Sequence, residues 1–514
     1  MTPPKPALTF DFTGMQLDRH QGLSRQLYQW LRQRVLDGQL SSGTRLPASR
    51  DLAATLSISR NSVMRAYDQL YAEGFIEGHV GDGTYVTLLL NKATATKKLS
   101  TKLSTGLVTG LPTALSTKHP KPTDFLSSEV IHSTALDRLE QHHLSPRKTG
   151  LPRAFRVGVP AFDLFPFAIW GKLHGAFWRR PGLEHLGYGD PAGEWRLREL
   201  IAVYLRTSRD LNCTAEQIVI TNGAQQAITL CAQLLLESGD GVAVEDPGYR
   251  AAGHAFAIAG ASLRGIAVDE DGMSSQALEK SDCKLAYVTP SHQYPTGVTM
   301  SLARRLQLLA WAEQTGGWIV EDDYDGEYRY SGAPLTPLAA LDRSGRVLYV
   351  GTFGKVAFPA LRLGYLVLPL GLVEPFSQRR AVDMRHSEIG TQAVMAEFIA
   401  AGHFQRHIRR MRRAALSRRN ALLAGWPEGI AGCGPMPKPV AGLHVALKVN
   451  SVAREQELVA LAESVGVEIN PLSEYWLPES TTPMDERAGL VLGFAAVPEA
   501  DIASALGRLR QVWS

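Results

Sequence analysis

The chain lacks the features that mark membrane, secreted and disulfide-stapled proteins. None of its 514 residues falls in an apolar run approaching the about 18 residues that a membrane span needs. The stretch Met1–Pro6 lacks the apolar region of a secretory signal. The four cysteines are scattered and form no C-x-x-C pair, which argues against a disulfide framework and a structural zinc site. These absences predict a cytoplasmic protein with no membrane partner and no metal.

The chain also lacks a large excess of positive charge. Its formal net charge of +4 is too small to indicate nucleic-acid binding by itself. Positive charge is nevertheless concentrated in two places. The stretch Ser41–Arg65 carries several arginines against the single acid Asp51, and His403–Arg419 is rich in arginine with no acid. For the first run, nucleic-acid contact is favoured over a solvated face, given the pattern around it. For the second run, a helix that joins two parts of a larger domain is favoured over a second DNA contact.

Length and composition predict a globular protein of at least two domains. A chain of 514 residues exceeds one ordinary domain, and 45% hydrophobic with 20% charged residues is enough to bury a full core. Residues 88–150 are rich in Thr, Ser, Lys, Leu and Pro with almost no aromatic side chains, so a linker is predicted there, with a short ordered piece near 133–144.

The N-terminal region follows a helix, helix–turn–helix, hairpin pattern. Apolar residues recur every four positions over Leu23–Val35, a second helix is expected after Pro47, and a third after Ser59. The runs Phe75–Glu77 and Thr84–Val86 flank a Gly/Asp-rich turn, as in a β-hairpin. Together these elements outline a winged helix-turn-helix, whose recognition helix enters the major groove of DNA.

Four motifs in this region carry a resemblance. They are R-L-P-A-S-R at 45–50, S-R-N-S-V at 59–63, A-Y at 66–67 and G-D-G-T-Y-V at 81–86. In this order they resemble the DNA-binding domain of the GntR superfamily. The resemblance implies double-stranded DNA as a partner. The residues expected to contact it are Arg45, Ser49, Arg50, Ser59, Arg60, Asn61, Ser62, Arg65 and Gly81.

From about residue 151 short apolar runs alternate with helical periodicity, which is typical of buried parallel strands in an α/β sheet. The expected strands are 218–220, 241–244, 285–288, 318–320 and 347–350. Open sheets of this kind bind ligands at the carboxyl ends of their strands. Lys355, Asp322 and Tyr324 directly follow such ends, and T-N-G-A-Q-Q-A at 221–227 leads from a strand into a helix.

These residue types are the ones that pyridoxal 5′-phosphate (PLP) requires. The cofactor needs a lysine for a Schiff base, an acid beside the ring nitrogen, an aromatic stacker and a phosphate cup. Asp323 is an alternative to Asp322, but Asp322 has the spacing to Tyr324 that the resemblance below implies. Tyr249, in D-P-G-Y, offers the aromatic face.

In motif order, roughly 360 residues resemble the fold-type I aminotransferases. The resemblance implies that Lys355 is the catalytic, aldimine-forming lysine, that Asp322 pairs with the ring nitrogen and Tyr324 with the ring hydroxyl, and that Tyr188 reaches the phosphate of the other subunit of a homodimer. The full set of expected cofactor-binding residues is Lys355, Asp322, Tyr324, Arg362, Tyr249, Gly223, Ala224, Gln225, Thr352 and Tyr188. Fused to a GntR-type domain, this module resembles the MocR subfamily of transcriptional regulators.

The expected fold class is therefore α/β: an N-terminal winged helix-turn-helix plus a large fold-type I PLP-dependent aminotransferase-like domain, with a mainly parallel sheet and a small C-terminal α/β subdomain. The expected boundaries are 17–87 for the DNA-binding domain, 88–150 for the linker and 151–514 for the PLP-binding effector domain.

Several positions depart from the aminotransferase pattern. Gly354 replaces a serine before the lysine, and Tyr294 replaces an asparagine that bonds the ring hydroxyl, for which His292 or Gln293 could compensate. Ala251 replaces the arginine that γ-aminobutyrate-responsive relatives carry. No substrate-binding arginine is evident near the C-terminus, where Arg487 is the candidate.

Three functions remain open at this point. One is a transcriptional regulator that senses an amino compound through an aldimine on Lys355, with weak or no transaminase turnover. A second is a regulator for which PLP itself is the signal. A third is a working aminotransferase with an accessory DNA-binding domain. The sequence alone leaves the effector, the operator and the direction of regulation undetermined.

Overall fold

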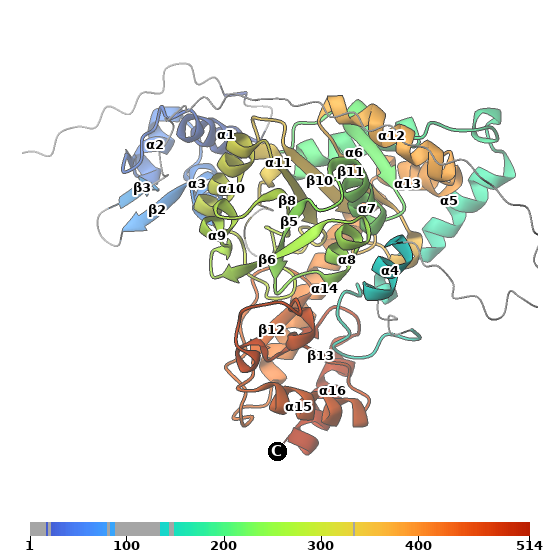
Figure 1. The fold of residues 1–514 in the computed structure, drawn as a ribbon. Coiled ribbons are helices and arrows are strands. Elements are labelled where there is room, and N and C mark those ends of the chain that lie inside the picture. Colours follow the sequence, from blue (N-terminus) through green and yellow to red (C-terminus); the bar gives the residue numbers. More distant parts are fainter. Residues whose placement is uncertain are drawn as a thin grey trace, which may run out of the picture.

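The computed structural model of the chain describes residues 17–18, 22–79, 83–87, 134–142, 149–330, 332 and 335–513. Within them, residues 23–86 form a small N-terminal domain, here called the reader, and residues 151–513 form the body (Figure 1). One short helix, α4 (Thr134–Gln141), falls in the segment where an ordered piece is expected, and it packs against the body helix α8 (Arg250–Ile258).

The reader combines three helices with a three-stranded antiparallel sheet. Its helices are α1 (Leu23–Leu36), α2 (Ser49–Leu56) and α3 (Arg60–Ala72). Its strands are β1 (Arg45–Leu46), β2 (Ile76–His79) and β3 (Gly83–Val86), in the order β1-β3-β2. The Ser59 side chain accepts a hydrogen bond from the Ser62 amide and so begins α3. The predicted winged helix-turn-helix is confirmed, and β1 is an addition that the sequence pattern did not indicate.

The body is built on an eight-stranded sheet with the order β4-β11-β10-β9-β8-β5-β6-β7. Six strands share one direction, while β11 and β7 run against them. Its strands are β4 (Ile218–Thr221), β5 (Gly241–Asp246), β6 (Ser262–Asp269), β7 (Gly272–Met273), β8 (Cys283–Val288), β9 (Trp318–Asp323), β10 (Val347–Thr352) and β11 (Gly364–Val367). The expected mainly parallel sheet and its five predicted strands are confirmed.

Helices cover both faces of this sheet (Figure 1). One face is packed by α7 (Ala224–Leu235) and α8, and Val244, Val320 and Val350 point toward them. The alternate residues Ala243 and Ile319 point to the opposite face, toward α9 (Ser275–Glu279) and α10 (Leu302–Thr315). The remaining helices of the body are α5 (Phe167–Arg179), α6 (Trp195–Ser208), α11 (Leu338–Leu341), α12 (Leu370–Met384) and α13 (Ile389–Ala400).

A smaller C-terminal unit follows the long helix α14 (His403–Gly425). The strands β12 (His444–Lys448), β13 (Asn470–Pro471) and β14 (Gly489–Gly493) pair antiparallel in the order β12-β14-β13, and α15 (Val452–Ser464) and α16 (Glu499–Trp513) cover them. Along α14, Phe404 and Met411 pack in the large core while Leu422 packs in the small one. The helix therefore joins the two units, as was expected for the second basic run.

Candidate functional site

A cavity of about 570 Å³ lies at the carboxyl ends of the parallel strands. Residues after β4, β9 and β10 reach it, as expected for an open α/β sheet. Nine of the ten expected cofactor-binding residues line it, and Tyr188 does not. The nine are Gly223, Ala224, Gln225, Tyr249, Asp322, Tyr324, Thr352, Lys355 and Arg362.

Lys355 lies just beyond β10, and its ammonium donates a 2.8 Å hydrogen bond to the carbonyl of Gly158. The contact allows little room, because a Cβ built on Gly158 would lie 2.9 Å from the lysine nitrogen. Gly158 also has a φ of +77°, which favours glycine. The sequence offered no motif for Gly158, which lies almost 200 residues before the lysine.

Asp322 is the next-to-last residue of β9 and is buried in the cavity wall. Tyr287 donates a 2.7 Å hydrogen bond to its Oδ2 atom, whereas Oδ1 is buried without a hydrogen-bond partner among the described residues. Burial raises the pKa of Asp322 to about 7, although the bond from Tyr287 opposes the shift. The carboxylate thus has one acceptor atom available for a buried N–H group. Sequence reasoning missed Tyr287, whose only signal is a hydroxyl at the end of an apolar strand.

Asp323 faces the other side of the sheet. It accepts a 2.7 Å hydrogen bond from Tyr349 and lies 3.0 Å from the buried guanidinium of Arg209. Successive side chains of a strand alternate between faces, so only one of the two neighbouring acids can enter the cavity. Of the two candidates for the ring-nitrogen acid, the structure places Asp322 there.

The expected phosphate cup lies where β4 turns into α7. Gly223 caps α7 with a φ of +80°, and the free amides of the first helical turn open toward the cavity wall. The guanidinium of Arg362 lies against Gly223, since a Cβ there would be 3.3 Å from it. Arg362 also donates a 2.6 Å hydrogen bond to the Asn222 carbonyl. A fixed cation beside free amides suits a phosphate.

Aromatic rings surround the middle of the cavity. Tyr249 and Tyr294 meet edge to face with centroids 5.8 Å apart, and Tyr294 meets Tyr324 in the same way at the same distance. The Tyr249 hydroxyl donates to Gln225 at 3.3 Å. Tyr294 therefore contributes a ring at the position where an asparagine was expected.

Of the two residues considered as substitutes for that asparagine, Gln293 is turned away. Its amide donates to Glu245 and to the Pro247 carbonyl, and it does not line the cavity. His292 also lies behind the wall, but its Nδ1 atom is 3.0 Å from the Tyr324 hydroxyl. His292 thus reaches the cavity only through Tyr324.

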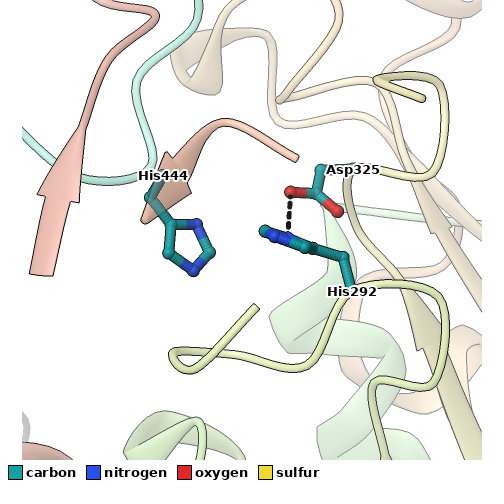
Figure 2. Close-up of side chains that lie close together, drawn as sticks. All are labelled: His292, Asp325 and His444. Carbon is teal, nitrogen blue, oxygen red and sulfur yellow. Dashed lines mark hydrogen bonds and ion pairs between the residues drawn. The ribbon is translucent and has the colours of Figure 1, made fainter. Parts of the chain in front are cut away.

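His292, Asp325 and His444 form a buried cluster whose potential ligand atoms lie within 4.8 Å of one another (Figure 2). No metal was expected from the sequence, and most of the cluster is already hydrogen-bonded. His292 Nδ1 is 3.0 Å from both Asp325 and the Tyr324 hydroxyl, and His444 Nε2 is 3.0 Å from the Pro295 carbonyl. His292, itself bonded to Asp325, thus supports Tyr324, whereas His444 bonds the backbone at Pro295.

Two further expected residues lie outside the cavity. Tyr188 is 90% exposed and contacts His386 edge to face. Arg487 donates to the carbonyls of Thr482 and Ser480 and does not line the cavity, so it does not supply the missing substrate arginine. Ala251 lines the cavity, and the only arginine among the described lining residues is Arg362.

In the reader, the expected DNA contacts gather around the start of α3. Arg50, Arg60 and Asn61 are exposed, and Arg60 reaches the Ser49 hydroxyl at 3.4 Å. Arg45 packs against Gly83 at the base of the wing, and Gly81 lies outside the described residues. The list of expected contacts is Arg45, Ser49, Arg50, Ser59, Arg60, Asn61, Ser62, Arg65 and Gly81.

Arg65 differs from the other expected contacts. It lies near the middle of α3 and lines a groove of about 590 Å³ between the reader and the body, together with Arg209 and Asp210. Arg65 lines this groove and is exposed as well. The basic run on α14 is turned inward in part: Arg418 donates to the Ala495 carbonyl and to Asp163.

Comparisons with known proteins agree with both parts of the chain. Residues 23–86 match the family model for bacterial regulatory proteins of the gntR family, and residues 182–509 match the model for aminotransferase class I and II. The probable rhizopine catabolism regulatory protein MocR of Rhizobium meliloti is 34% identical over 96% of this chain and 94% of its own. The chain belongs to the MocR subfamily of the GntR superfamily.

Other members of this family are similar over nearly their full length. The pyridoxine biosynthesis regulator PdxR of Corynebacterium glutamicum is 31% identical over 92% of both chains, and TauR of Rhodobacter capsulatus is 30% identical over 94% of this chain and 96% of its own. An archaeal alanine:glyoxylate aminotransferase structure superposes with a TM-score of 0.65 at 26% identity, over 74% of this chain and 96% of that one. The body therefore has the fold-type I aminotransferase fold, and the chain is a DNA-binding transcriptional regulator. Among the described residues, no helix is both long and apolar enough to cross a bilayer.

Proposed function

We propose that this regulator binds PLP in the body and senses either an amino compound or PLP itself. Binding of this signal changes the affinity of the protein for DNA. The observation that carries the proposal is that Lys355 and Asp322 line the same cavity. The Oδ1 atom of Asp322 is buried there and has no hydrogen-bond partner within the described part of the chain. A buried polar atom without a partner is costly, so a ligand that donates an N–H there would be favoured. The protonated ring nitrogen of PLP is such a donor.

The residues present fit the cofactor at its ring nitrogen, its carbonyl group and its phosphate. When bound, PLP supplies a carbonyl carbon that reacts with amines and a ring that accepts electron density. Lys355 is the amine within the cavity, Arg362 and the α7 amides offer a phosphate cup, and Thr352 adds a hydroxyl at its edge. Tyr249 and Tyr294 exclude water from the faces of the site.

A homodimer is part of this proposal. The helix α5 is rich in large apolar side chains, yet none of its residues is buried in the described chain. Phe167 and Trp178 on α5 are about half exposed, and the nearby Tyr188 is 90% exposed. A partner subunit that covers this surface would bury these rings. Tyr188 of each subunit would then reach the cavity of the other subunit, as the family resemblance implies.

The alternative is a working aminotransferase with an accessory reader. Two observations disfavour it: Arg362 is the single arginine among the described lining residues, and Tyr294 takes the place of the asparagine. An amino-acid panel separates the two functions, because sustained transamination at about 1 per second or faster is ordinary enzyme turnover. Such turnover would favour the aminotransferase function over the regulator that only senses a ligand.

The proposal is tested by absorption and DNA binding on the same samples. Wild type, Lys355→Ala and the exposed-lysine control Lys280→Ala are incubated with PLP, and each is titrated with DNA from upstream of its own gene. We expect a visible absorption band in wild type and Lys280→Ala that Lys355→Ala lacks, with strongly salt-dependent DNA binding. A wild-type protein that shows no band with excess PLP would overturn the cofactor assignment.

A further inference from the structure

The reader is not merely tethered to the body but packed on it. Leu302 of α10 and Leu341 of α11 belong to the same apolar cluster as the reader's core residues Leu31 and Phe75. Figure 1 shows the reader beside α10 and α11. Because this contact is apolar and continuous with a folding core, it defines a docking surface on the body.

A first polar anchor lies at Thr336, just before α11. Its hydroxyl is 2.9 Å from the Tyr28 hydroxyl of α1 and donates a 3.0 Å hydrogen bond to the Glu73 carboxylate. Tyr28 donates a 2.8 Å hydrogen bond to the same carboxylate. All three side chains are more than nine-tenths buried, so their bonds are shielded from water.

Thr336 is held in place from the side of the sheet. The buried Arg305 donates a 2.6 Å hydrogen bond to its carbonyl. The two carboxylate oxygens of Glu321 accept the amides of Leu338 and Ala339, at 2.8 and 2.9 Å, and so cap the first turn of α11. Glu321 is a residue of β9 with no exposed surface.

A second polar anchor lies at Asp210, after α6. Gln29 of α1 donates a 2.6 Å hydrogen bond to it, and the guanidinium of Arg32 lies 3.7 Å away. The preceding residue, Arg209, points inward, where it lies 3.0 Å from the Asp323 carboxylate. Asp323 is again a residue of β9.

Both anchors are therefore connected through hydrogen bonds and ion pairs to β9, the strand that carries Asp322. Glu321, Asp322 and Asp323 are consecutive; Asp322 enters the cavity, and its two neighbours face the opposite side, toward the anchors. We propose that the surface around Thr336 and Asp210 is a docking site for the reader, and that filling the cavity at Asp322 changes its strength through Glu321 and Asp323. This inference rests on the proposed function, because PLP is the ligand assumed to fill the cavity.

Docking of this kind would change DNA binding because it restricts the recognition helix. Arg65, Asp68 and Gln69 of α3 line the groove beside the body, whereas Arg60 and Asn61 at the start of the helix lie outside it. A docked reader holds α3 in one orientation on the body, and a released reader can turn its recognition helix freely. A ligand that favours one of these two states must shift the affinity for DNA.

The test measures coupling in the full-length protein. DNA affinity is measured by fluorescence anisotropy with and without PLP for wild type, Thr336→Val, Asp210→Asn and Asp37→Asn. The last variant is a matched control, since Asp37 pairs with Arg343 at the exposed edge of the same contact and such pairs contribute little. Hydrogen exchange of α1 reports docking directly and confirms that each variant is folded.

We expect PLP to change the DNA affinity of wild type and Asp37→Asn by about 5- to 150-fold, the usual range of coupling between sites. In Thr336→Val and Asp210→Asn we expect the ratio of the DNA affinities measured with and without PLP to move toward one. Hydrogen exchange in α1 should be faster, and the PLP absorption band should be unchanged. If both ligands bind wild type but the ratio is one, or if neither variant alters it, the docking inference fails while the proposed function stands. If wild type binds no PLP, both fail together.

Discussion

The hydroxyl of Tyr287 and the Oδ2 atom of Asp322 are 2.7 Å apart on neighbouring strands, and the other carboxylate oxygen of this cavity residue is buried with no partner among the residues that the structure describes. Tyr287 on β8 thus orients the carboxylate of Asp322 on β9. A ligand that donates to the remaining oxygen gains a bond that the protein does not make for itself.

Tyr287→Phe should therefore weaken PLP binding. Loss of the hydrogen bond removes the interaction that lowers the pKa of Asp322, so the acid stays protonated to a higher pH and pairs less well with a cationic ring nitrogen. A charged hydrogen bond of this kind is worth about 1.5–3 kcal/mol, so about a tenfold or greater loss of affinity is expected in an absorption titration at pH 7. Tyr349→Phe, which removes the equivalent 2.7 Å bond to Asp323, is the control and should leave the affinity unchanged. Equal losses in both variants would contradict the assignment.

Gly158→Ala should impair the reaction of Lys355 with PLP. The added methyl group would lie 2.9 Å from the lysine nitrogen and displace it. Gly150→Ala is a matched control, because Gly150 also has a positive φ, +83°, but has no atom within 4 Å of the added Cβ. The measurement is the PLP absorption band, with the melting temperature of each variant recorded alongside. If the two variants lose the band equally, backbone strain rather than contact with Lys355 is responsible.

The melting temperature of the apo protein should fall as the pH rises from 6.5 to 8. Burial raises the pKa of Asp322, Glu245 and Glu321 to about 7 in the folded chain, far above their values in an unfolded one. The folded state thus holds protons that the unfolded state has already released, so stability is lost as the pH rises through about 7. Burial lowers the pKa of His407 to about 4 and that of His444 well below its usual value, which opposes this trend mainly below the usual histidine pKa of about 6.5. A melting temperature that rises across this window would contradict the prediction.

Arg60→Ala should weaken DNA binding across sequences. Arg60 is exposed at the start of α3, among the residues expected to contact DNA, and arginine contacts with DNA are most often made to phosphate. We expect the slope of log affinity against log salt to fall by about one, as for the loss of one phosphate contact. Arg65→Ala should reduce the slope less, because Arg65 lines the groove toward the body. An equal reduction would mean that Arg65 leaves this groove when DNA binds.

Metal analysis checks the cluster of His292, Asp325 and His444. After dialysis against zinc and then buffer, we expect less than one equivalent of zinc per chain by mass spectrometry. Retention of one equivalent in wild type, lost in His444→Gln, would reassign the cluster as a metal site.

The sequence was sufficient for those parts that local chemistry determines. Lys355 and Asp322 follow apolar strands, and Ser59 begins a helix, so each could be placed from its neighbours in the chain. Gly158 and Tyr287 could not, because their roles arise only when distant segments meet: Gly158 is almost 200 residues from the lysine it contacts. No pattern distinguishes a tyrosine that bonds an acid from one that fills a core.

The docking surface was hidden for the same reason. Thr336 and Asp210 occur in no motif and lie in connections between helices and strands. Arg65 is grouped with the expected DNA contacts because it shares a basic stretch with them, and the sequence did not indicate that it also lines a groove beside the body. A sequence pattern reports which residues are polar, and the tertiary packing decides what they face.

The alternation of side chains along β9 has a consequence for how this strand can change. Its cavity-facing acid and its two dock-facing acids are assigned to their faces by a period of two. Insertion or deletion of a single residue within β9 would exchange the faces, directing Glu321 or Asp323 into the cavity and Asp322 toward the anchors. A one-residue shift in β9 would therefore disrupt ligand binding and reader docking in a single event.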